Sequence, residues 1–446
     1  MPPAPKVLAK EKPLWLMLWD VSHSSLSIWP DYAFDTLFER YERWGFRAVL
    51  VNDPEGVRHV LTDIANYRKP HAFRRLLRPL GGAGLFLTDG AVWRRQRRAL
   101  AHTFTPANVG VLLPHFHDAG VHLLSSVENT KEINLSKVLQ DTALEAVLRA
   151  LFSMADSDAR EKLHAMVRHY VEGPGRVTVF DALAKNEDSF AFANGKRNRF
   201  QKAWSSKIDE IVTERKSLPK TARSRDLLDL LLDLRDPDSG EALSVAEIRD
   251  QCATMLAAGS ETTSRLMFWA CYLLANDRGE QRRVHDEIAA FPPERVQVLD
   301  DLQNWPRLRN VLLEALRLYP PVAHFRRDVL SPDEICGEKV TPNMQVVISP
   351  WVLHRHRKFW DRPTAFIPDR FAGKAAPWMQ MPAFLPFGGG PRVCIGLSFA
   401  LAEAQIVLAC LLMRYKIGLT KSEPVLPVGR VTIQPSYEPA FRLERG

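Results

Sequence analysis

The sequence contains few cysteines, only five in 446 residues, and their number is odd. None of them has the CxxC spacing typical of zinc sites, and an odd number does not fit a framework of disulfide bonds. Both absences favour a reducing compartment, so we expect a cytoplasmic protein. Three of the five, Cys252, Cys271 and Cys410, fall in apolar helical patterns, where a cysteine usually packs as a small apolar side chain.

Long apolar runs are also missing. The best N-terminal candidate, Leu14–Trp19, is six residues long and is followed by Asp20, whereas a membrane-spanning helix needs about 20 apolar residues. The run is too short for a secretory signal, and no small-residue cleavage pattern follows it. We therefore expect no transmembrane segment. Trp15, Trp19 and Trp29 are candidates for contact with a membrane surface, although packing in a core explains them more simply.

The excess of positive charge is small: 60 Lys and Arg face 52 Asp and Glu, a formal net charge of +8. Such a chain can meet nucleic acid, an acidic protein or a membrane surface. No nucleic-acid recognition motif is present, so we expect no nucleic-acid partner. The basic residues concentrate between Arg68 and Arg98, where an amphipathic helical pattern explains most of them as a solvated face. No repeat or flexible linker divides the chain, and we expect a single domain over residues 1–446.

Helical periodicity dominates the rest of the chain. The clearest helical stretches are residues 32–44, 91–101, 135–152, 199–215, 244–276 and 397–415. The helix expected at Ser244 starts with a capping box, Ser244 and Glu247, and is well beyond the usual length. Short strand-like runs lie at 47–51, 333–335, 345–349 and 431–434. Because strands and helices do not alternate, the pattern predicts a mainly α fold with small β-sheets.

One loop carries the strongest chemical signal, Phe387-Gly388-Gly389-Gly390-Pro391-Arg392-Val393-Cys394-Ile395-Gly396, directly before a predicted helix. Successive glycines let a loop pass close to a flat ligand without side-chain clashes. Cys394 precedes a helix N-terminus, whose amides and dipole favour a thiolate. A thiolate is the axial ligand that pushes electron density onto a haem iron and promotes O–O cleavage. Phe387 is then a candidate to shield the sulfur, Arg392 to pair with a propionate, and Gly396 to let the helix approach the macrocycle.

This loop resembles the cysteine-ligand loop of the cytochrome P-450 family, F-x-x-G-x-R-x-C-x-G, at every fixed position. A chance match in a chain of this length is on the order of one in ten thousand, which leaves a structural cysteine after a glycine-rich turn as the weaker alternative. The resemblance extends from about Trp93 to Gln434. It implies the family's fold, in which a long central helix lies over the haem and the cysteine loop beneath it. It also implies haem b (iron protoporphyrin IX) with Cys394 as metal ligand, Gly388 in the cofactor loop, and O₂ as cosubstrate.

Two motifs upstream support the resemblance. Glu314-Ala315-Leu316-Arg317 resembles the family's E-x-x-R element, and residues 366–371 match F-x-P-x-R-F with Arg370 as the arginine. The i, i+3 spacing places Glu314 and Arg317 on one helix face. The resemblance implies that the three side chains form a buried network behind the cysteine loop. We assign them to folding and haem incorporation, because such a network holds structure in place and does no chemistry.

A further element, Ala258-Gly259-Ser260-Glu261-Thr262-Thr263, lies midway along the long helix. Glycine destabilises a helix by about 1 kcal/mol relative to alanine, and threonine is also a poor helix former. Residues of low helix propensity in the middle of a long helix suggest a functional site. The resemblance implies that Ala258 and Gly259 line the groove where dioxygen binds, and that Glu261 and Thr262 deliver protons during its activation. The alternative is that the hydroxyls only bond back to helix carbonyls.

Partners for the haem propionates are also implied by the resemblance. Trp93 and Arg97 match the family's W-x-x-x-R element, and Arg327 follows Pro320-Pro321 as a further cation, with the adjacent Arg326 as the alternative. Guanidinium groups suit carboxylates because they form bidentate, charge-assisted bonds. For any one of these arginines taken alone, a surface salt bridge is the simpler explanation.

The resemblance implies a monooxygenase that inserts one atom of O₂ into a small hydrophobic organic substrate. The acid–threonine pair favours this function over two alternatives, a peroxide-driven peroxygenase and a non-enzymatic haem sensor. Because no flavin or iron–sulfur domain follows the last strands, we expect electron transfer from a separate ferredoxin or flavodoxin with its NAD(P)H reductase, and a monomeric enzyme. The pocket walls implied by family position are largely apolar: residues 73–86, Ala257, Ala258, Val322–Phe325 and the turn at Tyr437.

Overall fold

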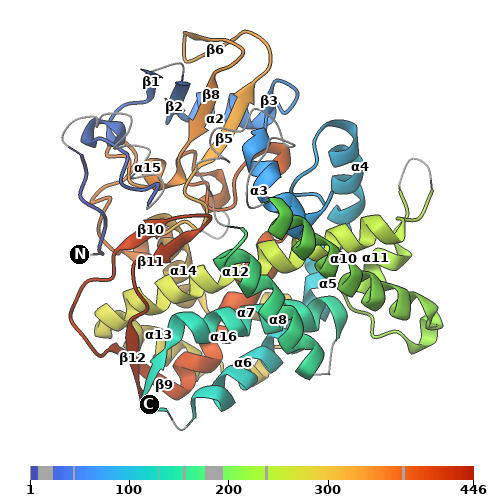
Figure 1. Ribbon diagram of the computed structural model, residues 1–446. Helices are drawn as coiled ribbons and strands as arrows, with labels where there is room; N and C mark the ends of the chain where they lie inside the picture. Colours follow the sequence, from blue (N-terminus) through green and yellow to red (C-terminus); the bar gives the residue numbers. More distant parts are fainter. Residues whose placement is uncertain are drawn as a thin grey trace. The chain divides into compact units, whose positions relative to one another are not determined.

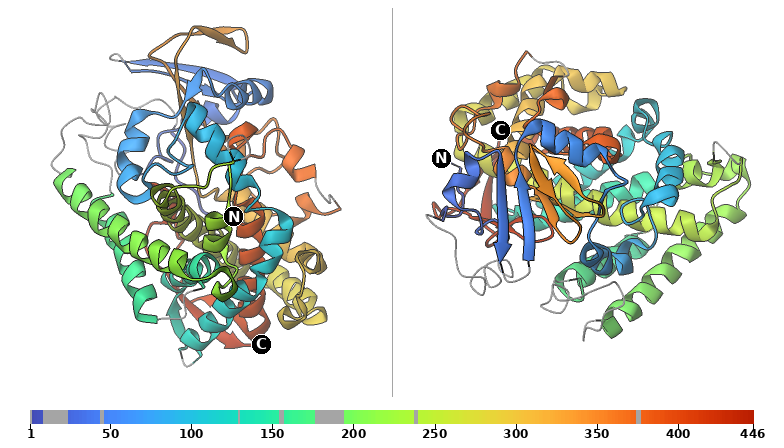
Figure 2. Two further views of the ribbon diagram at one scale, coloured as in Figure 1. Left: turned by 90° about the vertical axis from the view of Figure 1, so that its right-hand side faces the viewer. Right: turned by 90° about the horizontal axis from the view of Figure 1, so that it is seen from above.

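The structure is a computed structural model that describes residues 2–8, 24–43, 46–128, 130–153, 157–175, 194–236, 240–373 and 377–446. The chain separates into two compact units, the first made of residues 1–68, 120–140 and 262–446 and the second of residues 69–119 and 141–261. Figure 1 and Figure 2 colour both units along the sequence. The single domain expected over residues 1–446 stays a prediction.

Among the residues that the structure describes, the second unit consists of helices. Their core is tied by buried hydrogen bonds: Trp204 Nε1 donates to the carbonyl of Leu80 at 2.8 Å, and the Tyr170 hydroxyl donates to that of Leu76 at 2.6 Å. Its elements are α3 (His71–Gly81), α4 (Gly90–Ala101), α5 (Pro106–Val111), the start of α6 (Leu113–Val127), most of α7 (Leu135–Phe152), α8 (Ser157–Glu172), α10 (Asn194–Ser217), η2 (Lys220–Ala222), α11 (Leu227–Asp233) and the first half of α12 (Val245–Asn276).

The first unit contains a five-stranded sheet with the strand order β1-β2-β8-β5-β3. Its strands are β1 (Phe38–Arg43), β2 (Phe46–Val51), β3 (Tyr67–Arg68), β5 (Phe325–Val329) and β8 (Gln345–Ile348). The pair β2–β8 is parallel and the other pairs are antiparallel, and Figure 2 shows blue β1 and β2 beside the orange strands. Helix α2 (Pro54–Thr62) covers one face, where Val57 and Leu61 join Val49 and Val346 in an apolar cluster.

Smaller sheets and helices complete the first unit. The sheets are β4 (Glu132–Asn134) with β12 (Ala440–Arg445) and β9 (Tyr415–Leu419), β10 (Pro427–Gly429) with β11 (Ile433–Pro435), and β6 (Asp333–Ile335) with β7 (Glu338–Val340). The helices are α13 (Arg278–Ala290), α14 (Pro306–Leu318), α15 (Pro350–Leu353) and α16 (Leu397–Arg414), with the 3₁₀ turns η1 (Asp31–Phe34), η3 (Pro293–Arg295), η4 (Leu299–Asn304), η5 (Pro368–Phe371), η6 (Pro377–Gln380) and η7 (Gly390–Arg392).

The predicted mainly α fold with small sheets is confirmed, and so is the start of its longest helix. The Ser244 backbone N–H donates to Glu247 Oε2 at 2.9 Å, and the Glu247 N–H donates to Ser244 Oγ at 3.2 Å. These two bonds form the capping box expected from the sequence, and α12 then runs for 32 residues. The helices predicted at 91–101, 135–152, 199–215 and 397–415 are α4, α7, α10 and α16.

The helix predicted over residues 32–44 is wrong. Only Asp31–Phe34 forms a 3₁₀ turn, and Phe38–Arg43 is strand β1, paired with β2 from Phe38 opposite Val51. The apolar residues Phe34, Phe38 and Tyr41 have helical spacing, but β2 needs a partner for its second edge, so tertiary pairing overrides the local pattern. Trp15 and Trp19 lie outside the described residues, and Trp29 is packed in the core at 6% exposure, as the simpler explanation predicted.

One helix among the described residues, α16, has the length and mean hydropathy (1.7) that would allow it to cross a membrane. The protein buries 72% of that 18-residue window. Helices α13 and α14 pack against α16 within the first unit. Its apolar composition is therefore explained by its place in the core, directly after the cysteine loop.

Candidate functional site

The loop before α16 has a backbone that only glycine adopts easily. Gly388 and Gly390 have φ angles of +73° and +62°, a region that side chains disfavour. A Cβ at Gly390 would stand 2.4 Å from the carbonyl oxygen of Leu61 in α2. The N–H of Cys394 donates to the carbonyl of Phe387 at 2.9 Å and closes the loop. The glycine-rich motif is thus required for this loop to fold against α2.

Cys394 is exposed at the end of this loop, three residues before α16 begins. Cys252, Cys271 and Cys410 are buried, as predicted, and burial raises the pKa of each thiol. Cys336 is also exposed, but burial of its sulfur and the charge of Asp53 raise the pKa of that thiol to about 11. Cys394 is therefore the accessible cysteine whose setting suits a metal thiolate.

The residues around Cys394 fit a haem. Arg392 is half-buried in the same loop, and the Phe387 ring packs 6.2 Å from that of Trp378. A Cβ at Gly396, the N-cap of α16, would meet no atom within 4 Å, so the protein's own packing does not require a glycine there. An open glycine, an accessible sulfur and a guanidinium within five residues form a cradle of the kind that a flat, anionic iron cofactor needs.

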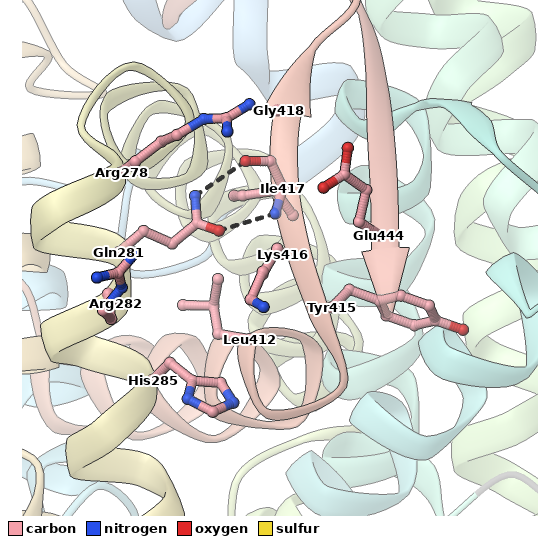
Figure 3. A pocket seen from close by; sticks show the side chains of 10 residues that line it. All are labelled: Arg278, Gln281, Arg282, His285, Leu412, Tyr415, Lys416, Ile417, Gly418 and Glu444. Carbon is pink, nitrogen blue, oxygen red and sulfur yellow. Dashed lines mark hydrogen bonds between the residues drawn. The ribbon is translucent and has the colours of Figure 1, made fainter. Parts of the chain in front are cut away.

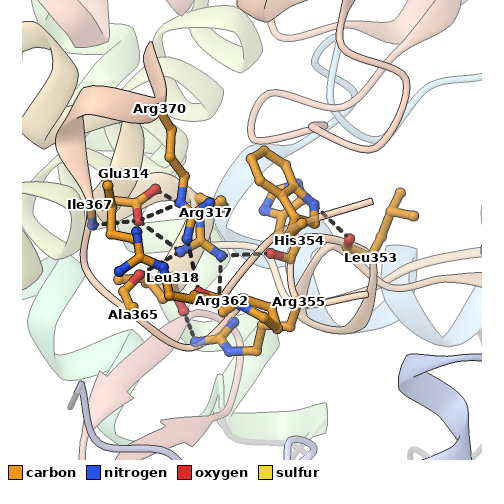
Figure 4. Close-up of polar contacts among 12 residues, drawn as sticks. Glu314, Arg317, Leu318, Leu353, His354, Arg355, Arg362, Ala365, Ile367 and Arg370 are labelled. Atoms are coloured by element: carbon orange, nitrogen blue, oxygen red, sulfur yellow. Dashed lines mark hydrogen bonds and ion pairs between the residues drawn. The ribbon is translucent and has the colours of Figure 1, made fainter. Parts of the chain in front are cut away.

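The predicted network of Glu314, Arg317 and Arg370 is confirmed (Figure 4). Arg317 donates to both oxygens of Glu314 at 2.7 Å, and Arg370 Nε lies 3.4 Å from Glu314 Oε1. Both Glu314 and Arg317 are fully buried. Arg317 also donates to three backbone carbonyls, those of His354, Pro363 and Ala365, and the Ile367 N–H donates to Glu314. Because Arg317 donates both to Glu314 and to these three carbonyls, the pair fixes the segment after α15 to α14.

His354 ties this network to the cysteine loop, and the sequence analysis missed it. Its Nε2 accepts a hydrogen bond from the N–H of Leu385 at 2.8 Å, and its carbonyl accepts from Arg317. Burial and the neighbouring arginines lower the pKa of His354 to about 3, so the ring is neutral and able to accept. No motif points to this histidine, because its role depends on a segment 31 residues further along the chain.

The middle of α12 has an accessible stripe. Thr254, Ala258, Glu261 and Thr262 are half-buried, whereas the opposite side and the following turns are buried. The Ser260 hydroxyl donates to the carbonyl of Leu256 at 2.7 Å. For this hydroxyl, the alternative of a bond back to the helix backbone is therefore correct. A Cβ at Gly259 would come within 3.1 Å of Val147 in α7, which gives this glycine a packing role.

Glu403 on α16 is a second residue that the sequence analysis missed. It is fully buried, and neither of its carboxyl oxygens has a hydrogen-bond partner of normal geometry among the described residues. Burial raises its pKa well above the usual range, opposed only by the adjacent Thr263 hydroxyl of α12. A charged residue type within the apolar run of α16 was the available signal.

Trp93 and Arg97 share the inner face of α4 in the second unit. Trp93 is buried and Arg97 half-buried, while Arg94 is exposed. Gln96 holds the turn before the helix through Thr88 Oγ1 at 2.8 Å and the Ala83 carbonyl at 2.9 Å. The i, i+4 spacing of Trp93 and Arg97 therefore places both on one side of a fixed helix. Their contact with the propionates stays a prediction.

Arg326 and Arg327 lie on opposite faces of β5 because side chains alternate along a strand. Phe325 approaches the cysteine loop: its Cζ is 3.6 Å from where a Cβ of Gly388 would stand. Arg327, two residues on, shares that face and is half-buried. The structure thus separates the two arginines that the sequence left as alternatives.

A pocket of about 310 Å³ lies elsewhere in the first unit, between α13, the end of α16 and β9. Figure 3 shows Gln281 bonded to the backbone of Ile417, and the lining also includes Arg278, Arg282 and Lys416. The lining contains none of the predicted site residues. It is not the candidate active site.

Comparisons with known proteins agree with the loop geometry. The family model described as Cytochrome P450 matches residues 41–438. Cyclooctatin synthase of Streptomyces melanosporofaciens is 30% identical over 366 residues, 82% of this chain and 79% of its own length. Cyclooctat-9-en-7-ol 5-monooxygenase of the same organism is 29% identical, over 83% and 80% of the two chains. The crystal structure of the cytochrome P450DA heme domain matches with a TM-score of 0.79 and 25% identity, covering 92% of this chain and 90% of that one.

Proposed function

Because the chain belongs to the cytochrome P450 family and is accordingly a haem-thiolate monooxygenase, we propose that Cys394 is the thiolate that holds its haem. The observation that carries this assignment is the loop that exposes Cys394 at the start of α16 while two left-handed glycines keep its backbone against α2. The bound haem supplies the iron at which O₂ is activated and one oxygen atom is transferred to the substrate.

The protein's own cations, with one indole donor, would hold the haem carboxylates. Arg392 in the cysteine loop, Arg327 on β5, and Trp93 with Arg97 on α4 are the proposed partners of the propionates. Arg327 is chosen over Arg326 because it shares a face of β5 with Phe325, which approaches Gly388. Guanidinium groups in partly dry surroundings bind carboxylates through strong, charge-assisted bonds.

Protons reach the site along α12. We assign Thr262 to hold a proton donor beside the reacting oxygen, Glu261 to pass protons from solvent, and Ala258 with Gly259 to shape the groove. The half-buried stripe of Ala258, Glu261 and Thr262 supports this, because a proton path needs polar groups that water can reach. A haem sensor would need no such pair.

Electrons come from a separate protein in this proposal, a ferredoxin or flavodoxin with its NAD(P)H reductase. The exposed Arg94 on α4 suits an acidic partner. We propose a single haem domain over residues 1–446, in a cytoplasmic and monomeric enzyme. The two Streptomyces relatives support a bacterial-type enzyme, although the related chains also include human and plant cytochromes P450.

The test of the thiolate uses the two exposed cysteines. The reduced carbonyl complex of the wild type should show the red-shifted absorption typical of the family. Cys394→His should lose this band even if haem is retained, and Cys336→Ser should keep it. A band that survives in Cys394→His would refute the assignment. Incorporation of ¹⁸O from ¹⁸O₂ into product then distinguishes the monooxygenase from a peroxide-driven enzyme.

A further inference from the structure

The pocket between α13, the end of α16 and β9 has walls that the protein fixes by itself (Figure 3). Gln281 of α13 is buried, and its side-chain amide forms two hydrogen bonds with the backbone of Ile417 in β9, both at 2.9 Å. Strand β9 is in turn paired with β12 along its whole length. Helix and strand therefore keep their separation without a ligand. The volume of about 310 Å³ lies at the lower end of the range for small-molecule sites, about 300–1,000 Å³, so the pocket suits a small ligand.

Positive charge dominates the lining of this pocket. Helix α13 supplies Arg278 and Arg282, one turn apart on the same face, and β9 supplies Lys416. All three residues are exposed, and none of their side chains has a hydrogen bond or an ion pair with another described residue. The one acid among the described lining residues is Glu444, which stands opposite Lys416 in the β9–β12 pair but outside ion-pair distance. Three cations against one carboxylate leave an excess of two positive charges.

The acids of α13 do not neutralise these cations. Glu280 and Glu287 accept hydrogen bonds from the first turn of α14, at 2.7 and 2.8 Å. Asp277 accepts the backbone N–H of Glu280 at 2.9 Å and so caps its own helix, and Asp286 lies 3.6 Å from the ring of His285. Cations that gather at one pocket repel each other when no acid stands between them. The arrangement therefore favours an anion from outside the chain.

The charge and the donors of the pocket match a phosphate group. A phosphate monoester carries a charge of about −1.5 to −2 at pH 7 and has three acceptor oxygens, whereas a carboxylate would cancel only one of the two excess charges. Arg278 and Arg282 offer planar forks that suit such oxygens, and Lys416 adds a point charge. Leu412 and Tyr415 also line the pocket, and they offer apolar surface to a small organic group on the phosphate.

We propose that this pocket binds a small, soluble phosphate monoester through Arg278, Arg282 and Lys416. The site is separate from the proposed haem site, because its lining contains none of the residues assigned there, and it does not depend on the proposed function. Since the three cations are exposed to water, the affinity should fall as the ionic strength rises.

The experiment titrates the haem-loaded protein at low ionic strength and pH 7.5 with phenyl phosphate, and with phenyl sulfate as an ester of similar shape but lower charge. Calorimetry should show that phenyl phosphate binds more tightly. Arg278→Gln, Arg282→Gln and Lys416→Gln should each weaken its binding by about 3–10-fold, a loss between those of an exposed ion pair and a buried charged hydrogen bond. The triple variant should show no binding. Glu444→Gln should strengthen binding severalfold, a gain that a misfolded variant cannot produce.

The control is Arg283→Gln, which removes the same charge from α13 at a residue outside the lining, where the arginine is paired with Glu280. It should leave the affinity within about twofold, because a charge outside the pocket acts only through a screened field. No binding of phenyl phosphate, equal affinity for the sulfate ester, or equal losses in Arg282→Gln and Arg283→Gln would overturn the proposal. So would binding only to vesicles that contain phosphatidate, which would make these cations a membrane contact. The red-shifted band of the reduced carbonyl complex should persist in every variant, so a failure of the proposed function would be seen separately.

Discussion

The Nε2 atom of His354 accepts a 2.8 Å hydrogen bond from the backbone N–H of Leu385, two residues before the cysteine loop begins at Phe387. This bond exists only while the ring is neutral, since a protonated imidazole has no free acceptor. The backbone carbonyl of the same histidine accepts a hydrogen bond from Arg317. The buried Glu314–Arg317 pair is therefore connected, through the backbone carbonyl and the uncharged ring of His354, to the segment that leads into the cysteine loop.

The first prediction is that mild acid destabilises this connection. His354 has a pKa of about 3 in the folded protein against 6.5 as its ordinary value. Its contribution to stability is complete above pH 6.5 and is lost as the pH falls toward 3, because only the unfolded chain takes up the proton. The loss reaches about 1.4 kcal/mol per pH unit below 6.5. His354→Gln keeps an acceptor oxygen, so its melting temperature should fall less between pH 7 and pH 5.

The control for this prediction is His122→Gln, at an exposed position of α6, which should keep the wild-type pH dependence. His324 has a similarly lowered pKa, so the dependence should shrink in His354→Gln without vanishing. An unchanged slope in that variant would show that His354 does not couple folding to pH.

Motifs and periodicity predicted much of the fold and the candidate site, and they failed where contacts are long-range. The long helix α12 was predictable because its capping box and period are local, and the pairing of Glu314 with Arg317 because it spans a single helix turn. Strand β1 was not, since its partner strand decides it. His354 could not be found either, because the basic run from His354 to Lys358 gives no sign of the backbone group that one of its histidines meets.

The second prediction concerns Glu403 and has the opposite sign. Burial raises its pKa above the ordinary 4.5, so the folded protein holds this proton after the unfolded chain has released it. Its effect is most favourable below pH 4.5 and is lost as the pH rises toward the folded pKa, by up to about 1.4 kcal/mol per pH unit. Glu403→Gln should therefore melt at a higher temperature than the wild type at pH 7.5, with a smaller difference at pH 5. Glu423→Gln, at an exposed site, should show no such trend, and a pH-independent difference in Glu403→Gln would contradict the buried neutral acid.

The third prediction concerns electron delivery. Arg94 is exposed on α4, whereas the neighbouring Arg95 is already paired with Glu247. Arg94→Glu should slow reduction by an acidic ferredoxin severalfold at low salt, and the difference should shrink at physiological ionic strength, where charges are screened beyond about 8 Å. Stopped-flow reduction across a salt series measures this. Arg95→Gln should have the smaller effect, and reduction rates of Arg94→Glu that match the wild type at every salt concentration would remove α4 from the docking surface.

The fourth prediction tests the chemistry assigned to α12. Thr262 and Glu261 are both accessible on the helix, and Thr263 beside them is buried against Glu403. A positioned proton donor typically contributes about 10²–10⁴-fold, so Thr262→Ala should impair product formation far more than substrate affinity. Electrons and O₂ should still be consumed, with hydrogen peroxide released in place of oxidised product. Glu261→Gln should mainly slow turnover, because it interrupts the supply of protons from solvent.

The matched control is Thr263→Ala, which removes the neighbouring hydroxyl from the buried side of the same helix. If Thr262 acts by its position at the reacting oxygen, Thr263→Ala should retain nearly the wild-type ratio of product to electrons consumed. Product and peroxide per reducing equivalent are the quantities to measure, since an alteration of helix packing alone would lower both in parallel. Added hydrogen peroxide should restore part of the product in Thr262→Ala, because that oxidant arrives already protonated. If Thr262→Ala forms as much product per electron pair as the wild type, Thr262 does not have the proposed role in proton delivery. If product forms only with added peroxide, the enzyme is a peroxygenase.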